Sequence, residues 1–267
     1  MRDLKLAIYG CGKLADLIVD KMIAGYIPEY RLIGAYSRTT ARAQKLSERV
    51  NSSSLGYSCK AVASLDELLE LQPDYIIEAA SPQALKEISL PALKQGVSLI
   101  CLSIGAFADT DFYEETKEAA VDNNAKIHLV SGAIGGFDVL RTVSFMGDSK
   151  VSFTTEKGPR SLRNTEVYTP ALEKEQQVVF KGTAEEAIAL FPTKVNVAVA
   201  ASLASVGPQK ERVTITSTPD YVGDEHCIHI QNEQVDARLC IYSKTAEIAG
   251  WSVLSTLRNI VSPVVFG

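Results

Sequence analysis

Short apolar runs alternate with segments of helical periodicity over the first half of the chain. An apolar run of 4–10 residues bounded by turn residues is typical of a buried strand, whereas apolar positions three and four apart indicate a helix. The runs predict strands at 4–9, 30–38, 75–81, 97–106 and 125–136, and helices at 13–22, 41–50, 82–96 and 111–124. Strands that alternate with helices in this way predict a doubly wound, mostly parallel α/β sheet, the Rossmann arrangement.

The pattern changes after Asp138. The second half predicts a strand pair over 142–158, an exposed connection over 159–177, a helical region over 182–207, and strands at 212–219, 225–232 and 236–243. The pattern therefore predicts an N-terminal Rossmann domain, 1–138, and an α+β domain, 139–267, to which the family resemblance described below assigns substrate binding and dimerisation. The final helix, 246–260, is a candidate to pack back on the first domain.

Composition narrows the class of protein. Hydrophobic residues make up 46% of the 267 residues, charged residues make up 22%, and the net charge is −5. That acidic balance, without a basic stripe, argues against a nucleic-acid partner, and no apolar run is long enough for a membrane span. The five cysteines have no paired spacing, so we expect reduced thiols in a cytoplasmic protein; they are Cys11, Cys59, Cys101, Cys227 and Cys240.

A dinucleotide-binding turn follows the first predicted strand. Gly10, Gly12 and Ala15 match the pattern G-x-G-x-x-G/A, in which the glycines permit a tight turn and a close approach of the pyrophosphate. The helix that begins there offers the N–H groups of its first turn, at Lys13 and Leu14, to the phosphates.

The end of the second strand bears on the choice of cofactor. An NAD site usually has an acidic residue there to bind the ribose hydroxyls, but this chain has Ser37 and Arg38. A hydroxyl and a guanidinium suit a 2′-phosphate, so we expect NADP(H) to bind at least as well as NAD(H). No flavin, haem or metal signature is present in the sequence.

Five further segments resemble the L-aspartate dehydrogenase family. They are ASPQALKE (80–87), LSIGAFAD (102–109), SGAIGGFDVLR (131–141), FPTKVNVAVAASLA (191–204) and SKTAEIAGWSVLSTLRN (243–259). The resemblance implies a homodimeric Rossmann enzyme that uses NAD or NADP to oxidise L-aspartate to iminoaspartate. That product hydrolyses to oxaloacetate and ammonia or enters NAD biosynthesis.

The resemblance also implies roles for particular residues. It places cofactor contacts at Ala80, Ser81, Ala133 and Asn196, and the active-site histidine at His226. Oxidation of an amino acid requires a base that takes a proton from the ammonium group, and histidine suits this task near neutral pH. For the two substrate carboxylates we expect backbone N–H groups at Ser131 and Gly132 and the cation of Lys244.

The segment GDEHCIHIQ holds two of the three histidines, His226 and His229. In a helix they would share one face and could chelate a metal, but the segment is strand-like and period-two alternation places them on opposite faces. We therefore expect no metal site here. His226 should lie with Ile228 and Ile230, and His229 with Cys227.

Two alternatives to an aspartate dehydrogenase stay open at this point. One keeps the fold and the cofactor but acts on another small amino or oxo acid. The other is a non-catalytic NADP(H)-binding sensor, which would bind the cofactor without turning over an amino acid.

Overall fold

The computed structural model describes residues 3–191 and 195–266. The chain divides into two compact units, Met1–Val130 with Ala249–Gly267, and Ser131–Ile248. This division lies a few residues before the boundary expected at residue 138. Within the described ranges, the chain has no helix both long and apolar enough to cross a membrane.

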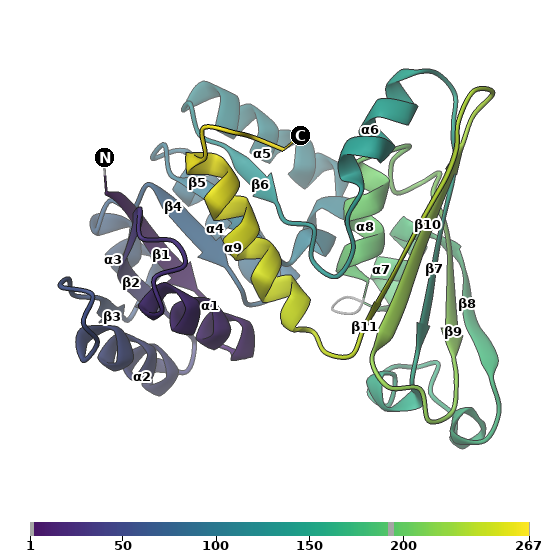
Figure 1. Cartoon of the computed structure of the whole chain (residues 1–267), viewed down its shortest axis with the longest axis horizontal. Coiled ribbons are helices and arrows are strands. Elements are labelled where there is room, and N and C mark those ends of the chain that lie inside the picture. The colour runs from purple at the N-terminus through teal and green to yellow at the C-terminus, as the bar shows by residue number, and fades with distance from the viewer. Residues whose placement is uncertain (1–2, 192–194, 267) are drawn as a thin grey trace. The chain divides into compact units, whose positions relative to one another are not determined.

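The first unit contains the parallel six-stranded sheet that the alternating pattern predicts (Figure 1). Its strand order is β3-β2-β1-β4-β5-β6, so the order reverses between β1 and β4, where doubly wound sheets bind their ligands. The strands are β1 (Leu4–Tyr9), β2 (Tyr30–Tyr36), β3 (Lys60–Val62), β4 (Tyr75–Glu78), β5 (Ser98–Cys101) and β6 (Ile127–Leu129). The predicted α/β class is therefore confirmed.

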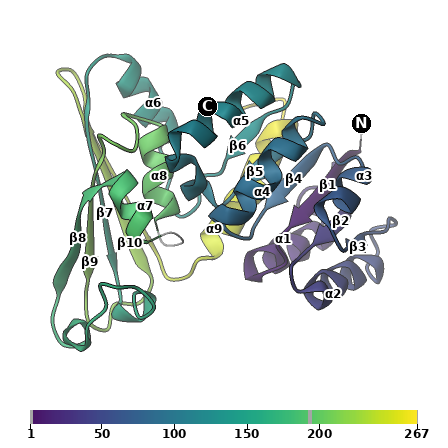
Figure 2. The ribbon, with the colours of Figure 1, turned by 180° about the vertical axis from the view of Figure 1, so that it is seen from behind.

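Helices cover both faces of this sheet. α1 and α9 lie on one face, and α4 and α5 lie on the other (Figures 1 and 2). The helices of this unit are α1 (Lys13–Ile23), α2 (Thr40–Asn51), α3 (Leu65–Glu70), α4 (Pro82–Leu93), α5 (Thr110–Asp122) and α9 (Glu247–Val261). Val253, Leu254 and Leu257 of α9 are buried in the same core as the α1 side chains. The hydroxyl of Tyr30 donates a buried hydrogen bond to the carbonyl of Leu257 at 2.8 Å.

The second unit is built on a mixed five-stranded sheet of order β11-β10-β7-β9-β8. Helices α6 (Phe137–Phe145), α7 (Ala184–Leu190) and α8 (Asn196–Leu203) pack on one face, which we call the inner face (Figure 1). The strands are β7 (Lys150–Lys157), β8 (Gln177–Thr183), β9 (Arg212–Ser217), β10 (Asp224–Gln231) and β11 (Asp236–Ser243). Burial alternates along β7 and β10 because successive side chains point to opposite faces.

Some elements differ from the sequence-based expectation. The strand pair predicted over 142–158 is wrong in its first half, because Phe137–Phe145 is helix α6 and only Lys150–Lys157 is a strand. Leu140 and Val143 are the buried residues of α6, and their spacing of three is helical. β3, α3 and β8 were not predicted, and residues 192–194 of the predicted helical region lie outside the described residues.

The expectation of five reduced thiols is also wrong. Cys227 and Cys240 form a disulfide, with their Cα atoms 4.1 Å apart. The two residues lie directly opposite each other in the antiparallel pair β10–β11, a relation that a sequence separation of 13 does not reveal. The cytoplasmic location, which was argued from reduced thiols, stays a prediction.

Alkylation under denaturing conditions tests the disulfide. Without reductant we expect a mass shift for three labelled thiols, those of Cys11, Cys59 and Cys101, and after reduction a shift for all five. Cys227→Ser is the control, because its labelling should not change on reduction. Five labels on the wild-type protein, purified and denatured without reductant, would contradict the disulfide.

Candidate functional site

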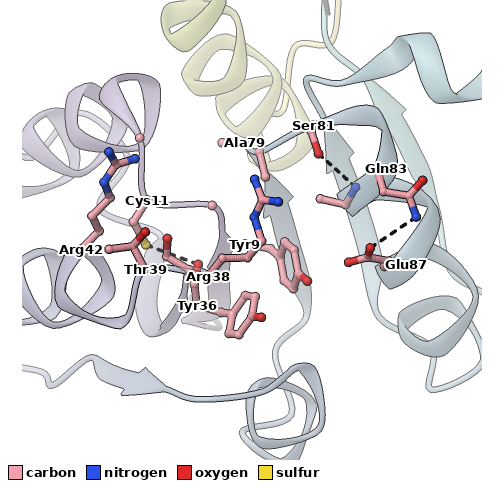
Figure 3. A pocket seen from close by; sticks show the side chains of 15 residues that line it. Tyr9, Cys11, Tyr36, Arg38, Thr39, Arg42, Ala79, Ser81, Gln83 and Glu87 are labelled. Atoms are coloured by element: carbon pink, nitrogen blue, oxygen red, sulfur yellow. Dashed lines mark hydrogen bonds between the residues drawn. The ribbon is translucent and has the colours of Figure 1, made fainter. Parts of the chain in front are cut away.

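A pocket lies at the carboxyl ends of three neighbouring strands of the first unit (Figure 3). Its volume is about 200 Å³. β1 ends at Tyr9, β2 at Tyr36 and β4 at Glu78, and the pocket is lined by the residues that follow each strand. Because parallel strands present their carboxyl ends at one edge, segments far apart in the sequence meet here. The lining includes Gly10, Gly12, Ser37, Arg38, Ala80 and Ser81.

Gly10 fits the tight turn that a dinucleotide requires. Its φ is +104°, and a Cβ added to it would lie 2.6 Å from the carbonyl oxygen of Ala79. Gly12 precedes α1 as its N-cap, and a Cβ added there would meet nothing within 4 Å. The backbone at the start of α1 is therefore open to a phosphate, and the N–H groups there favour an anion. These residues fit the pyrophosphate of a dinucleotide.

Arg38 and Arg42 differ from two other arginines of the first unit in having no ion pair among the described residues. Arg31 pairs with Asp3, and Arg49 with Asp16 and Asp20. In contrast, Arg38 and Arg42, which both line the pocket, have no ion-pair partner among the described residues. Arg38 extends across the pocket towards Tyr9 and Ala79, and Arg42 lies near Cys11 (Figure 3). Two unpaired guanidinium groups on one pocket favour an anionic ligand.

The second unit carries a cluster of buried polar side chains on the inner face of its sheet. We call it the inner polar cluster and define it as Thr155, Lys157, Ser217, Asp224 and His226. All except Asp224 are at most 4% exposed. The strand register brings them together, because His226 lies opposite Thr155, Asp224 opposite Lys157, and Lys157 opposite Ser217.

Several atoms of the inner polar cluster have no hydrogen-bond partner within residues 3–191 and 195–266. They are Nδ1 of His226, Oγ1 of Thr155 and Oγ of Ser217. Nζ of Lys157 lies 3.6 Å from Oδ1 of Asp224, and the His226 ring stacks on Phe153 with centroids 5.7 Å apart. Buried polar atoms are nearly always hydrogen-bonded in folded proteins, so such a concentration of unsatisfied atoms marks a place for a polar ligand.

Electrostatics keep the His226 imidazole neutral. Burial, together with the nearby Lys157 ammonium, lowers the pKa of His226 to about 4, and Asp224 opposes this shift. A neutral imidazole has one ring nitrogen free to accept a proton. The arrangement therefore combines a proton acceptor, a cation and two hydroxyl groups on one buried face.

The residues predicted from the sequence lie in three places. Gly10, Gly12, Ser37, Arg38, Ala80 and Ser81 line the pocket, whereas Lys13 and Leu14 begin α1 beside it without lining it. The second unit holds Ser131, Gly132 and Ala133 in the loop after β6, Asn196 as the first residue of α8, and His226 on β10. Lys244 is exposed beyond the end of β11 and is not among the charges that shift the pKa of His226.

Sequence reasoning missed several residues that the structure places at these sites. Arg42 lines the pocket, and Thr155, Lys157 and Ser217 belong to the inner polar cluster. A signal for two of them was present, since Val151, Phe153, Thr155 and Lys157 alternate along one strand and therefore share a face. Two polar residues that continue a buried apolar row indicate a site.

The alternation along β10 agrees with the face assignment made for the two histidines. His226, Ile228 and Ile230 are buried, whereas His229 is partly exposed and its Nε2 lies 2.9 Å from Oδ1 of Asp236. Among the described residues no group of three or more His, Cys, Asp or Glu side chains is placed to hold a metal ion.

Two family models match the chain, and full-length relatives are known. The model of the family "Aspartate dehydrogenase, C-terminal" matches residues 138–260, and "Homoserine dehydrogenase, NAD binding domain" matches 10–130. The chain is 31% identical to an L-aspartate dehydrogenase of Methanococcus maripaludis, with 99% of each chain covered. It is 30% identical to one of Methanocaldococcus jannaschii, again with 99% of each chain covered.

Solved structures extend the comparison to the fold. The crystal structure of aspartate dehydrogenase from Thermotoga maritima has a TM-score of 0.74 at 30% identity, with 99% of each chain covered. A hyperthermophilic archaeal homoserine dehydrogenase in complex with NADPH has a TM-score of 0.62 at 14% identity, which shows a shared fold alone. The full-length identity, the family models and the shared fold agree: this chain belongs to the L-aspartate dehydrogenase family.

Proposed function

We propose that the chain catalyses the reversible, NAD(P)-dependent oxidation of L-aspartate to iminoaspartate, which hydrolyses to oxaloacetate and ammonia. The observation that carries this proposal is the inner polar cluster, in which neutral His226 lies beside Lys157 with unsatisfied hydroxyl groups around them. A dicarboxylic amino acid offers carboxylate oxygens to the Lys157 cation and to the two hydroxyl groups, and a proton to the imidazole. The names of the full-length relatives support the same substrate.

His226 acts as the base in this proposal. The α-ammonium group must lose a proton before hydride can leave Cα, and the unpartnered Nδ1 is the candidate acceptor. A substrate carboxylate paired with Lys157 offsets the positive charge that holds the pKa of His226 down, so binding makes the imidazole a stronger base. Once the imidazolium has released that proton to solvent, the neutral imidazole can take a proton from the water that attacks the imine. A bound nicotinamide supplies the hydride acceptor.

Lys157 is the preferred partner of a substrate carboxylate. It is 4% exposed and close to His226, whereas Lys244 is exposed. Charge-assisted hydrogen bonds formed away from water are stronger than those on the surface. Lys244, Ser131 and Gly132 stay predictions from the sequence, as do Ala133 and Asn196 at the cofactor.

We also propose that NADP(H) binds at least as tightly as NAD(H). The pocket at the end of β2 holds Ser37, Arg38 and Arg42, and neither arginine has an ion-pair partner among the described residues. A 2′-phosphate would provide that partner. The homodimer and the role in NAD biosynthesis stay predictions from the family resemblance.

Steady-state kinetics with L-aspartate test the proposed reaction. In His226→Ala we expect kcat to fall by about 100-fold or more, because the general base is lost, while the dissociation constant of the cofactor stays within about twofold. His229→Ala is the matched control and should keep its activity, because this ring lies on the other face. No turnover of L-aspartate by the wild type, or full turnover by His226→Ala, would refute the assignment.

Substitution of the two lysines separates the two carboxylate assignments. Lys157→Met should raise KM for L-aspartate by roughly 10–100-fold, the value of one or two charge-assisted hydrogen bonds. Lys244→Met in the same assay tests the sequence-based assignment. A larger effect at Lys244 than at Lys157 would overturn the preference for Lys157.

Titration with the two reduced cofactors tests the assignment of the arginines. Arg38→Ala and Arg42→Ala should each weaken NADPH binding by about tenfold and change NADH binding little, because only NADPH carries the 2′-phosphate. Arg49→Ala, whose guanidinium pairs with Asp16 and Asp20, is the control and should affect neither cofactor. A clear preference of the wild type for NADH that Arg38→Ala leaves unchanged would contradict the assignment.

The pH dependence of stability tests the state of His226. Its pKa is about 4 in the folded chain and near 6.5 when unfolded, so the unfolded state binds more protons between these values. The wild type should therefore lose stability as pH falls from about 6.5 to about 4, and His226→Gln should lose less. Thermal unfolding curves of the two proteins over this range give the comparison, and parallel pH profiles would show that the histidine is not held neutral by the fold.

A further inference from the structure

Glu78 is the last residue of β4, and its carboxyl group is fully buried at the edge of the sheet where the pocket lies. It accepts four hydrogen bonds: from the N–H of Ala80 at 2.8 Å, of Ser81 at 3.0 Å and of Ser103 at 2.9 Å, and from the Ser103 hydroxyl at 2.9 Å. No cation pairs with it among the described residues.

These hydrogen bonds join two loops at the carboxyl edge of the sheet. Ala80 and Ser81 form the turn between β4 and α4 and line the pocket, and Ser103 follows β5. The same turn packs against the phosphate-binding turn, because a Cβ at Gly10 would meet Ala79 and Ala80 at 2.6–2.7 Å. Glu78 therefore fixes one wall of the pocket.

The four hydrogen bonds favour the ionised form of Glu78. A carboxylate is an acceptor only, and each of the four partners donates to it. Burial raises the pKa of Glu78, and the hydrogen bonds from Ala80, Ser103 and Ser81 oppose that rise. The three backbone N–H groups can only donate, and so a carboxylate fits this geometry better than a neutral carboxyl group.

An ionised Glu78 also changes which helix can bind phosphate. It accepts from the N–H groups of Ala80 and Ser81, which come just before the first residue of α4, and its charge repels an anion there, whereas the start of α1 at Gly12 stays open. Both helices begin beside the point where the strand order reverses, between β1 and β4. The negative charge beside β4 leaves that side to the end of the dinucleotide that carries no phosphate.

We propose that Glu78 is a positioning residue for the dinucleotide, because it fixes the Ala79–Ser81 wall of the pocket, and that its charge favours the oxidised cofactor. This inference rests on the proposed cofactor binding. The oxidised nicotinamide carries a positive charge that the reduced ring lacks. A fixed carboxylate at this edge therefore lowers the dissociation constant of the oxidised form more than that of the reduced form.

The test is calorimetric titration of the full-length chain with NADP⁺ and NADPH, and with NAD⁺ and NADH alongside. In Glu78→Gln the ratio of the dissociation constant of the oxidised form to that of the reduced form should rise by roughly 3–10-fold, the size expected for the loss of one partly screened charge. Ser103→Ala is the control, because it removes one donor and keeps the charge, and its ratio should match that of the wild type.

Glu78→Asp keeps the charge but is too short to reach both loops. We expect it to weaken binding of both forms with little change in their ratio, and unchanged dissociation constants would refute the positioning role. Equal weakening of both forms in Glu78→Gln would show a structural role alone and would refute the effect of charge. Tyr30→Phe, which loses a buried hydrogen bond away from the pocket, is the control for a general loss of stability. If the wild type binds neither form, the proposed cofactor binding fails, which is distinct from failure of this inference.

Discussion

The alternation of side chains along β7 and β10 is the constraint on which the inner polar cluster depends. Val151, Phe153, Ile228 and Ile230 must face the helices to form the core, and this places Thr155, Lys157 and His226 on the same face. Taking a lysine and a histidine out of water costs several kcal/mol unless partners compensate them. Asp224 compensates in part, and the unsatisfied atoms that remain are those that a dicarboxylate would bind.

In the first unit the equivalent constraint is the contact between two turns. The backbone of Ala79 lies so close to Gly10 that a Cβ at residue 10 would collide with it. Glu78 fixes the Ala79–Ser81 turn through its hydrogen bonds to the N–H groups of Ala80 and Ser81. The pocket therefore owes its shape to backbone packing and one buried carboxylate. Its charge comes from Arg38 and Arg42, which stand out in an acidic chain because no acidic partner among the described residues pairs with them.

Sequence reasoning reached the parts that depend on local periodicity. β1 was predicted with the bounds that the structure shows, Leu4–Tyr9, and the burial of His226 follows from alternation alone. α6 was mistaken for a strand because β-branched and aromatic residues favour strands, although only Leu140 and Val143 are buried in it. The cysteine pair was missed because it depends on the register of β10 and β11. Such long-range relations carry no local signal.

The same distinction explains the site. The glycine turn has a sequence pattern, so Gly10 and Gly12 could be identified directly. Glu78 and Arg42 have none, because their roles arise from loops that meet only in the folded sheet. Lys157 could be predicted in part. Its place in an alternating row is visible in the sequence, but its proximity to Asp224 and His226 depends on the pairing of β7 with β10.

The central claim is that a buried base and a buried cation together select a dicarboxylic substrate. Oxidation of NAD(P)H in the presence of ammonia, with oxaloacetate compared with pyruvate and 2-oxoglutarate, tests it most directly. We predict that kcat/KM for oxaloacetate exceeds that for pyruvate by about 100-fold or more, because pyruvate has no second carboxylate to bind the Lys157 cation. Equal or faster turnover of pyruvate, or no turnover of oxaloacetate, would contradict the claim.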